Sequence, residues 1–324
     1  MTNKTIEVNN FFNQFLLNTY NANLNLTQLE NFYVFSNYEK HYTESFSIEY
    51  AIQPTIQLDS FNKLNINENR LYKNSEWEAK DLKGKSVLEI GSGAGKFTEI
   101  LIKSECNLFS TDSSDAIQIN YKNNFSKLIN NKTYFIKADA KDLIFRNSVF
   151  NYILIYGVLQ NVKNQKEILK NSYKLLKPGG KFSFDVTKKY KFYLHLLNPK
   201  YFWRFIFKKI NRSSLYSFVQ FLVKKYYPLD TFLKKKFGKI GRIISKILFP
   251  FPLINYYFLD LDEETKINMS ILDTYDCLAS EYDHALTLNE VKILLKEIES
   301  EDNIYFNNLK IIEVNGLIVV NFLK

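Results

Sequence analysis

The most informative pattern in the chain is Ser86-Val87-Leu88-Glu89-Ile90-Gly91-Ser92-Gly93-Ala94-Gly95-Lys96. It opens with an apolar, strand-like run and continues with three of the chain's ten glycines, at positions 91, 93 and 95. Glycines directly after a strand let the backbone approach a ligand closely, and the helix that follows presents unpaired N–H groups. The stretch therefore predicts a strand, a ligand-holding loop and a helix.

Strand-like and helical segments alternate on both sides of this stretch. The strand-like runs are Ser86–Ile90, Asn107–Thr111, Tyr134–Lys137, Tyr152–Tyr156 and Lys181–Val186. Such alternation predicts a parallel sheet covered by helices on both faces. Near the C-terminus, Leu309–Val314 and Leu317–Phe322 are joined by Asn315-Gly316, a strong hairpin signal. We expect a doubly wound α/β fold whose mostly parallel sheet ends in an antiparallel hairpin.

Four regions follow from composition and pattern. Residues 1–75 are polar and Asn-rich and are interpreted as an N-terminal cap, and residues 76–187 form the core. Residues 188–262 break the alternation with a basic, aromatic segment that we predict to be helical. Residues 263–324 return to the core with a helix and the hairpin, and Thr287 with Glu290 forms a capping box that opens that helix.

The spacing of the glycines argues against a dinucleotide site. A dinucleotide fingerprint places its third glycine three residues after the second, but here Gly95 follows Gly93 by two and Lys96 stands at the expected position. An NAD-dependent oxidoreductase is therefore a disfavoured alternative.

The pattern Glu89-x-Gly91-x-Gly93-x-Gly95 instead resembles motif I of class I S-adenosylmethionine (SAM)-dependent methyltransferases. Leu176-Lys177-Pro178-Gly179-Gly180 resembles the turn before strand five of that family. The resemblance implies a Rossmann-like fold, SAM as cofactor, and Glu89 and the three glycines as cofactor-binding residues. No feature of the pattern calls for a metal.

Further cofactor residues are implied by the same resemblance. Asp112, at the end of the second strand, matches the acid that accepts the ribose hydroxyls, and Asp139-Ala140 matches the segment near the adenine amino group. Gly157 and Gln160 belong to a segment that resembles the strand-four motif lining the methyl-donor site.

Flanking segments show a narrower similarity to bacterial methyltransferase-domain proteins with a helical insertion after strand five. These segments are Ser45–Tyr50, Gln57–Ser60 and Leu272–Asp276. Members of that group are often associated with modification of surface glycans or small molecules. The resemblance implies methyl transfer to a small-molecule, glycan or lipid-linked acceptor, with a hydroxyl favoured.

The general base has two candidates. If the acceptor is a hydroxyl, a base helps to remove its proton, and His284 or Asp283 stands where the chain returns from the insertion. The strand-four motif usually continues with His and then Pro-Asp, but here it reads Asn161-Val162-Lys163-Asn164. This departure keeps open the alternative of a non-catalytic methyltransferase-like domain that acts as a membrane-surface or assembly factor.

Charge is distributed unevenly along the 324 residues. The segment from Lys188 to Phe258 holds sixteen Lys and Arg and one acid, so that the formal total of +9 leaves −6 on the rest of the chain. This asymmetry indicates a surface with its own partner. The pattern fits four interpretations: a lid over the site, attraction of an acidic substrate, peripheral contact with an anionic membrane, and an ordinary solvated face. Nucleic acid is disfavoured because no recognised nucleic-acid-binding motif accompanies the lysines.

Composition excludes several classes of protein. Two distant cysteines, Cys106 and Cys277, make a disulfide framework or a structural zinc site improbable. The longest uncharged apolar stretch, Ile247–Leu259, is too short to span a bilayer. The N-terminal residues have no apolar run of signal-peptide type. We expect a cytoplasmic protein that can contact the inner membrane surface peripherally.

Overall fold

A computed structural model describes residues 12–17, 25–26, 31–34, 43–128, 132–189, 199–207 and 209–324. The chain divides into two compact units. Unit 1 comprises residues 1–40, 63–189 and 282–324, and unit 2 comprises residues 41–62 and 190–281. The boundaries of these two units differ from those of the four regions expected from the sequence. The division into four regions stays a prediction.

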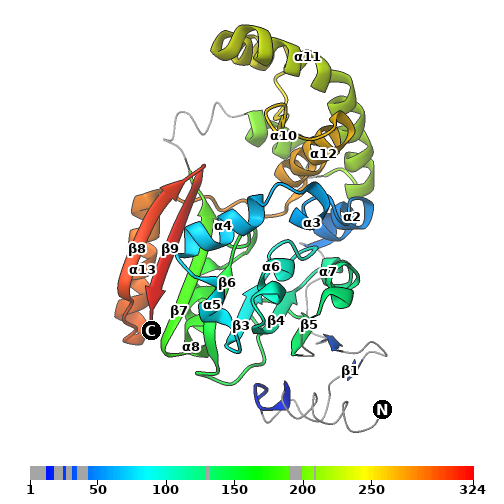
Figure 1. The fold of residues 1–324 in the computed structure, drawn as a ribbon. Coiled ribbons are helices and arrows are strands. Elements are labelled where there is room, and N and C mark those ends of the chain that lie inside the picture. The colour runs from blue at the N-terminus through cyan, green and yellow to red at the C-terminus, as the bar shows by residue number, and fades with distance from the viewer. Residues whose placement is uncertain are drawn as a thin grey trace. The chain divides into compact units, whose positions relative to one another are not determined.

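Unit 1 is built on one mixed sheet that contains nine strands in the described residues, in the order β1-β2-β5-β4-β3-β6-β7-β9-β8 (Figure 1). The strands are β1 (Asn25–Leu26), β2 (Phe32–Val34), β3 (Ser86–Ile90), β4 (Asn107–Asp112), β5 (Thr133–Lys137), β6 (Phe150–Ile155), β7 (Leu176–Thr187), β8 (Asn307–Val314) and β9 (Leu317–Leu323). Neighbours from β2 to β7 are parallel, whereas β1, β9 and β8 run antiparallel to theirs. The doubly wound, mostly parallel sheet expected from the sequence is therefore confirmed.

The predicted hairpin forms one edge of the sheet. Strands β8 and β9 are joined by Asn315 and Gly316, whose φ angles are 49° and 78°. Two consecutive residues with positive φ define the type I′ turn, whose twist matches that of paired strands. The hairpin therefore adds an antiparallel edge to β7.

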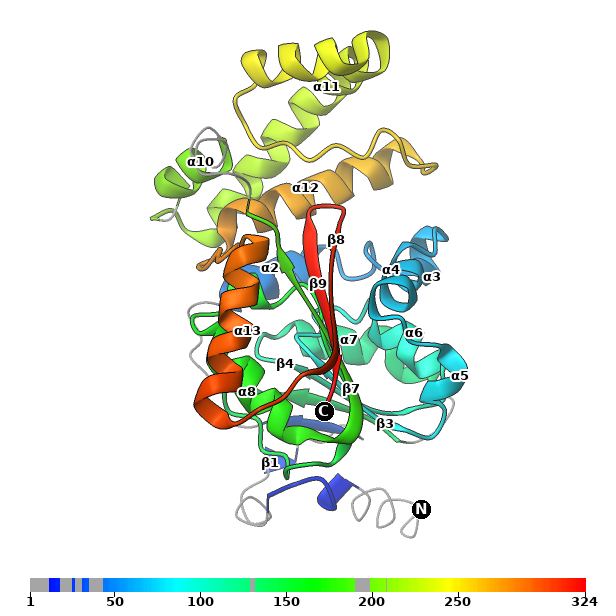
Figure 2. The ribbon, with the colours of Figure 1, turned by 90° about the vertical axis from the view of Figure 1, so that its left-hand side faces the viewer.

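Helices cover both faces of this sheet (Figure 2). One face packs against α8 (Gln165–Leu175) and α13 (Leu288–Asp302), and the other against α4 (Ile66–Ser75), α5 (Ala79–Leu82), α6 (Thr98–Lys103) and α7 (Ala116–Asn124). Alternate residues of β3 serve the two faces: Leu88 and Ile90 join the α8–α13 core, and Val87 joins the core under α4 to α6. A strand buried on both faces is mostly apolar, as β3 is, and its two polar residues, Ser86 and Glu89, are buried as well.

Unit 2 is helical, as predicted for the basic segment. It contains α2 (Glu44–Ile52), α3 (Asp59–Asn62), α10 (Pro199–Phe207), α11 (Arg212–Leu248) and α12 (Glu263–Ala279). Its core joins one face of α11 (Leu215, Val219, Val223) to α12 through Tyr275. Ile48 of α2 packs against the same core, so that residues far apart in the chain form this unit together.

The described helices were searched for membrane-spanning segments. None of them is both long and apolar enough to cross a bilayer.

Candidate active site

The glycine loop lies between β3 and α6 and is tied to the neighbouring strand. The N–H groups of Gly91 and Ser92 both donate to the carbonyl of Thr111, at 2.8 and 3.0 Å. Gly91 and Gly95 have φ angles of 74° and 94°. A Cβ at Gly91 would lie 2.1 Å from Cγ2 of Val158, and one at Gly95 would lie 2.1 Å from Oδ1 of Asn120. Glycine is required at both positions for conformation and for close packing.

Glu89 lies beneath this loop, at the end of β3. Its side chain is buried, and Oε2 accepts hydrogen bonds from the hydroxyls of Thr98 (2.6 Å) and Ser110 (3.1 Å). Burial raises the pKa of Glu89 to about 7, which the two hydroxyl hydrogen bonds oppose. The Nδ2 of Asn120 donates to the same two hydroxyls and to Ser92 Oγ, at 2.8 to 3.0 Å. Glu89 and Asn120 therefore form one polar network that supports the loop from below.

Asp112 ends the adjacent strand β4 and is held against the loop. Its Oδ2 accepts from the N–H of Gly93 at 2.8 Å, and its Oδ1 accepts from the N–H and the hydroxyl of Ser114, at 2.8 and 2.6 Å. Burial raises the pKa of Asp112 above its usual value, although the hydrogen bonds from Ser114 and Gly93 oppose this shift. The structure thus brings the predicted ribose-binding acid directly to the second glycine.

Asp139 and Ala140 follow β5, the next strand in the sheet. Asp139 is buried, and its Oδ1 accepts from the N–H of Lys141 at 3.0 Å. Because β3, β4 and β5 are parallel neighbours, their carboxyl ends meet at one edge of the sheet. The glycine loop, Asp112 and Asp139 therefore stand in a row along this edge.

Gly157 and Gln160 follow β6, on the other side of β3. Gly157 has a φ of 77°, and its N–H donates to Oδ1 of Asp185 at 2.6 Å. Oε1 of Gln160 is buried and makes no hydrogen bond within the described part of the chain. Buried acceptors are normally satisfied, so this oxygen fits a donor from a bound molecule. A glycine loop and an unsatisfied acceptor on one sheet edge fit a bound nucleoside cofactor such as SAM.

The two base candidates adjoin this segment. The N–H of His284 donates to the carbonyl of Gln160 at 2.7 Å, and its own carbonyl accepts from Nε2 of Gln165 at 2.8 Å. The side chain of His284 is exposed, and its ring lies 5.5 Å from that of Tyr282. Asp283 is half-buried beside it. The structure therefore brings His284 and Asp283, distant in sequence, to the end of β6.

An ion pair that the sequence patterns did not predict supports the same edge. Asp185 on β7 is fully buried, and its Oδ2 accepts from Nη2 of Arg70 at 2.5 Å. The guanidinium of Arg70 lies 5.5 Å from the ring centre of Phe97 and 5.8 Å from that of Tyr156. A buried carboxylate requires partners, and here Arg70 and Gly157 provide them. The signal in the sequence was an acid inside the apolar run Phe182-Ser183-Phe184-Asp185-Val186.

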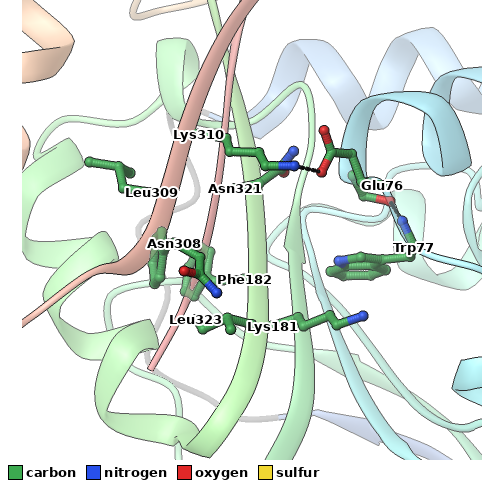
Figure 3. Close-up of a pocket in the computed structure, with 11 residues that line it drawn as sticks. Glu76, Trp77, Lys181, Phe182, Asn308, Leu309, Lys310, Asn321 and Leu323 are labelled. Carbon is green, nitrogen blue, oxygen red and sulfur yellow. Dashed lines mark hydrogen bonds and ion pairs between the residues drawn. The ribbon is translucent and has the colours of Figure 1, made fainter.

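A separate cleft of about 440 Å³ lies against the hairpin (Figure 3). Trp77 and Lys181 line it, together with Lys310, which forms an ion pair with Glu76 at 2.5 Å. None of the predicted site residues is among the residues that line it. This cleft is therefore distinct from the candidate active site.

Comparisons with known proteins agree with this geometry. Residues 88–182 match a family model described as a methyltransferase domain. The chain is 31% identical over 117 residues to the ubiquinone biosynthesis O-methyltransferase of Coxiella burnetii (36% of this chain, 50% of that protein). It is 28% identical over 131 residues to the ubiquinone/menaquinone biosynthesis C-methyltransferase of Haemophilus ducreyi (36% of this chain, 51% of that protein). The chain thus spans about half the length of the curated relatives it matches.

A solved structure of a SAM-dependent methyltransferase from Aquifex aeolicus is also similar. It is 10% identical, has a TM-score of 0.42, and the similarity covers 83% of this chain and 97% of that one.

The packing of the glycine loop predicts the effect of Gly95→Ala. Alanine at position 95 must adopt a positive φ, which costs about 1–2 kcal/mol, and its Cβ must also displace Asn120, which typically costs a further 1–3 kcal/mol. Gly84→Ala is the matched control, because Gly84 also has a positive φ, of 68°, but a Cβ added there would meet no atom within 4 Å. Urea unfolding should show the larger loss of stability for Gly95→Ala, and equal losses would contradict the packing described for the loop.

The buried carboxyl of Glu89 predicts a pH dependence of stability. Its pKa is raised from 4.5 to about 7, so its protonated form contributes stability that is complete below pH 4.5 and is lost as the pH rises through 7. Glu89→Gln stays neutral, so the unfolding free energy of the variant should exceed that of the wild type increasingly between about pH 4.5 and 7. Unfolding titrations over this range check the prediction, with the exposed Glu264→Gln as control. Parallel curves for Glu89→Gln and wild type would contradict it.

Proposed function

We propose that this chain, whose residues 88–182 form a methyltransferase domain of the class I SAM-dependent kind, transfers a methyl group from SAM to a hydroxyl of a small-molecule, glycan or lipid-linked acceptor. The observation that carries the proposal is the row of groups at the carboxyl edge of the sheet: the glycine loop, Asp112, Asp139 and Gly157. They occupy the ends of four neighbouring parallel strands, where ligands of open α/β sheets bind.

The cofactor residues divide into two roles. Asp112 and Asp139 offer carboxylate oxygens that would accept hydrogen bonds from the ribose hydroxyls and the adenine side of the cofactor. Glu89, because it is buried beneath the loop, would act by holding the loop in shape. SAM, when bound, supplies a methyl group that its sulfonium charge already activates.

The chain's own contribution to catalysis is then to place the acceptor and to remove its proton. Placement of the reacting atoms within about 3 Å and exclusion of water are the main tasks in such a transfer. His284 is our candidate base, with Asp283 beside it, because their segment is hydrogen-bonded to Gln160 at the end of β6.

The acceptor side is assigned to the basic insertion. The chain leaves unit 1 after Lys189 and returns at Tyr282. The segments next to these two points are bonded to each other: the Leu286 N–H donates to the Thr187 carbonyl at 3.0 Å, and the Lys189 N–H donates to the Leu286 carbonyl at 2.8 Å. Both connections therefore stand at the carboxyl end of β7. We propose that residues 188–262 supply a lid and acceptor contacts, and that this basic segment also makes peripheral contact with an anionic membrane.

The relatives support a small-molecule acceptor. Both curated relatives are named for the biosynthesis of quinones, one as an O-methyltransferase and the other as a C-methyltransferase. A hydroxyl acceptor with an apolar portion is therefore the first class to test on this chain.

Calorimetric titration with SAM is the first test of the proposal. Asp112→Ala should weaken binding by roughly 1–3 kcal/mol, the loss expected for hydrogen bonds to a charged group. Because Asp112 also binds Gly93 and Ser114, Asp112→Asn is measured beside it, and Asp260→Ala at an exposed position is the control. A folded wild-type protein that binds no SAM would refute the proposal. SAM binding without methyl transfer to a broad acceptor panel would favour the non-catalytic alternative.

The role of His284 is tested by His284→Ala. Its backbone hydrogen bonds to Gln160 and Gln165 remain available in the variant, so the segment should keep its place. Loss of a general base should lower kcat for a hydroxyl acceptor about 10²–10⁴-fold, with SAM affinity unchanged and a changed pH profile. Unchanged turnover with intact SAM binding would remove His284 as base and leave Asp283, tested by Asp283→Asn.

A further inference from the structure

The C-terminal end of α11 buries polar side chains and exposes apolar ones. Residues 229–248, here called the α11 tip, form two arms that meet at Gly238, where the backbone leaves the helical region (φ 51°, ψ −119°; Figure 2). The arms touch at Gly241, where a Cβ would lie 1.9 Å from the carbonyl oxygen of Leu233. In the first half of α11, by contrast, apolar residues face the core of unit 2.

Polar groups hold the interior of the α11 tip together. Asp230 is 3% exposed and accepts hydrogen bonds from Ser245 Oγ on the other arm, from Asn255 Nδ2 at 2.5 Å and from Lys234 Nζ at 2.7 Å. Asn255 also donates to Thr231 Oγ1 at 3.0 Å. One buried carboxylate thus cross-links both arms and the segment that follows them.

Most of the large apolar side chains of the tip are exposed. Seven of its large apolar residues are exposed: Leu229 (44%), Phe232 (51%), Phe237 (44%), Ile240 (65%), Ile243 (60%), Ile247 (73%) and Leu248 (55%). Leu233 is the large apolar residue of the tip that is buried, at 8%. Seven exposed large apolar side chains within twenty residues indicate an interaction site.

Cations alternate with these exposed apolar residues along the sequence. The tip carries six Lys and Arg and one acid, the buried Asp230. Lys234 is paired with Asp230, and the remaining five form no ion pair within the residues that the structure describes: Lys235, Lys236, Lys239, Arg242 and Lys246. On the second arm, the cations at 239, 242 and 246 each stand next to an exposed isoleucine at 240, 243 and 247.

This arrangement complements an anionic lipid surface. Apolar side chains flanked by Lys and Arg are the pattern of helices that lie in the membrane interface, where the apolar groups enter the acyl boundary and the cations meet the headgroups. A second copy of the chain would bring the same positive charge to the interface and be repelled. We propose that the α11 tip docks into an anionic phospholipid bilayer. The α11 tip would then be the surface that makes the membrane contact of the proposed function, on which this inference rests. Its binding to a membrane can be measured without methyl transfer.

Co-sedimentation with vesicles tests the docking. The full chain should bind vesicles of an equal mixture of phosphatidylcholine and phosphatidylglycerol, should not bind phosphatidylcholine alone, and should bind more weakly at high salt. Ile243→Ser with Ile247→Ser should lower the partition coefficient about tenfold or more, because two apolar side chains that would enter the bilayer are lost. Lys235→Gln, Lys236→Gln and Lys239→Gln should each lower it about fivefold.

Matched substitutions on α13 control for nonspecific effects. Ile293 is 47% exposed and Lys292 is exposed beside it, so Ile293→Ser and Lys292→Gln should leave vesicle binding unchanged. Failure of the wild type to bind the anionic vesicles, or equal binding by the tip variants, would overturn the proposal. Self-association that Ile243→Ser and Ile247→Ser abolish, without vesicle binding, would assign the surface to a second copy and also overturn it. SAM titration of the same samples separates this outcome from failure of the proposed function.

Discussion

The burial of the Glu89 carboxyl under the glycine loop is the constraint on which the candidate site depends. A carboxyl in that place must be hydrogen-bonded, and Thr98 and Ser110 bind it from two adjoining elements while Asn120 binds both hydroxyls from a third. The network therefore sets the distances between β3, β4, α6 and α7. The loop above it is held by this network through Ser92 and by two hydrogen bonds to the Thr111 carbonyl, so its shape depends on groups of the protein itself.

The other half of the sheet edge is organised by a different buried acid. Asp185 binds the N–H of Gly157 and the guanidinium of Arg70, and so joins α4 and β7 to the loop after β6. The two halves of the edge thus rest on two different buried acids. Glu89 supports the glycine loop indirectly, through the hydroxyls of Thr98 and Ser110, whereas Asp185 binds the backbone of Gly157 directly. Asp112 combines two tasks, because it binds the Gly93 N–H of the glycine loop and is also our candidate for the ribose hydroxyls.

The local patterns predicted the core well because its strands are short apolar runs with clear ends. Strand β3, the glycine loop and the turn at Asn315-Gly316 depend on neighbours in the chain, and the structure has them where expected. Element boundaries and distant pairs were harder to predict. Leu176, expected in the turn before the fifth strand, begins β7. Arg70 and Asp185, which form an ion pair, stand 115 residues apart in the chain. The strand β2 has only three residues, so its hydrophobic pattern is too short to predict that it pairs with β5. Whether the predicted residues bind SAM is a matter for the titrations.

The composition of unit 2 from two chain segments has an evolutionary consequence. Ile48 of α2 packs into the same core as α11 and α12, although residues 41–62 precede the sheet and residues 190–281 interrupt it. A lineage that exchanged only the later segment would leave Ile48 of α2 without its packing partners. Divergence of this unit therefore requires paired changes at two separated places in the gene, which makes wholesale replacement harder than gradual drift.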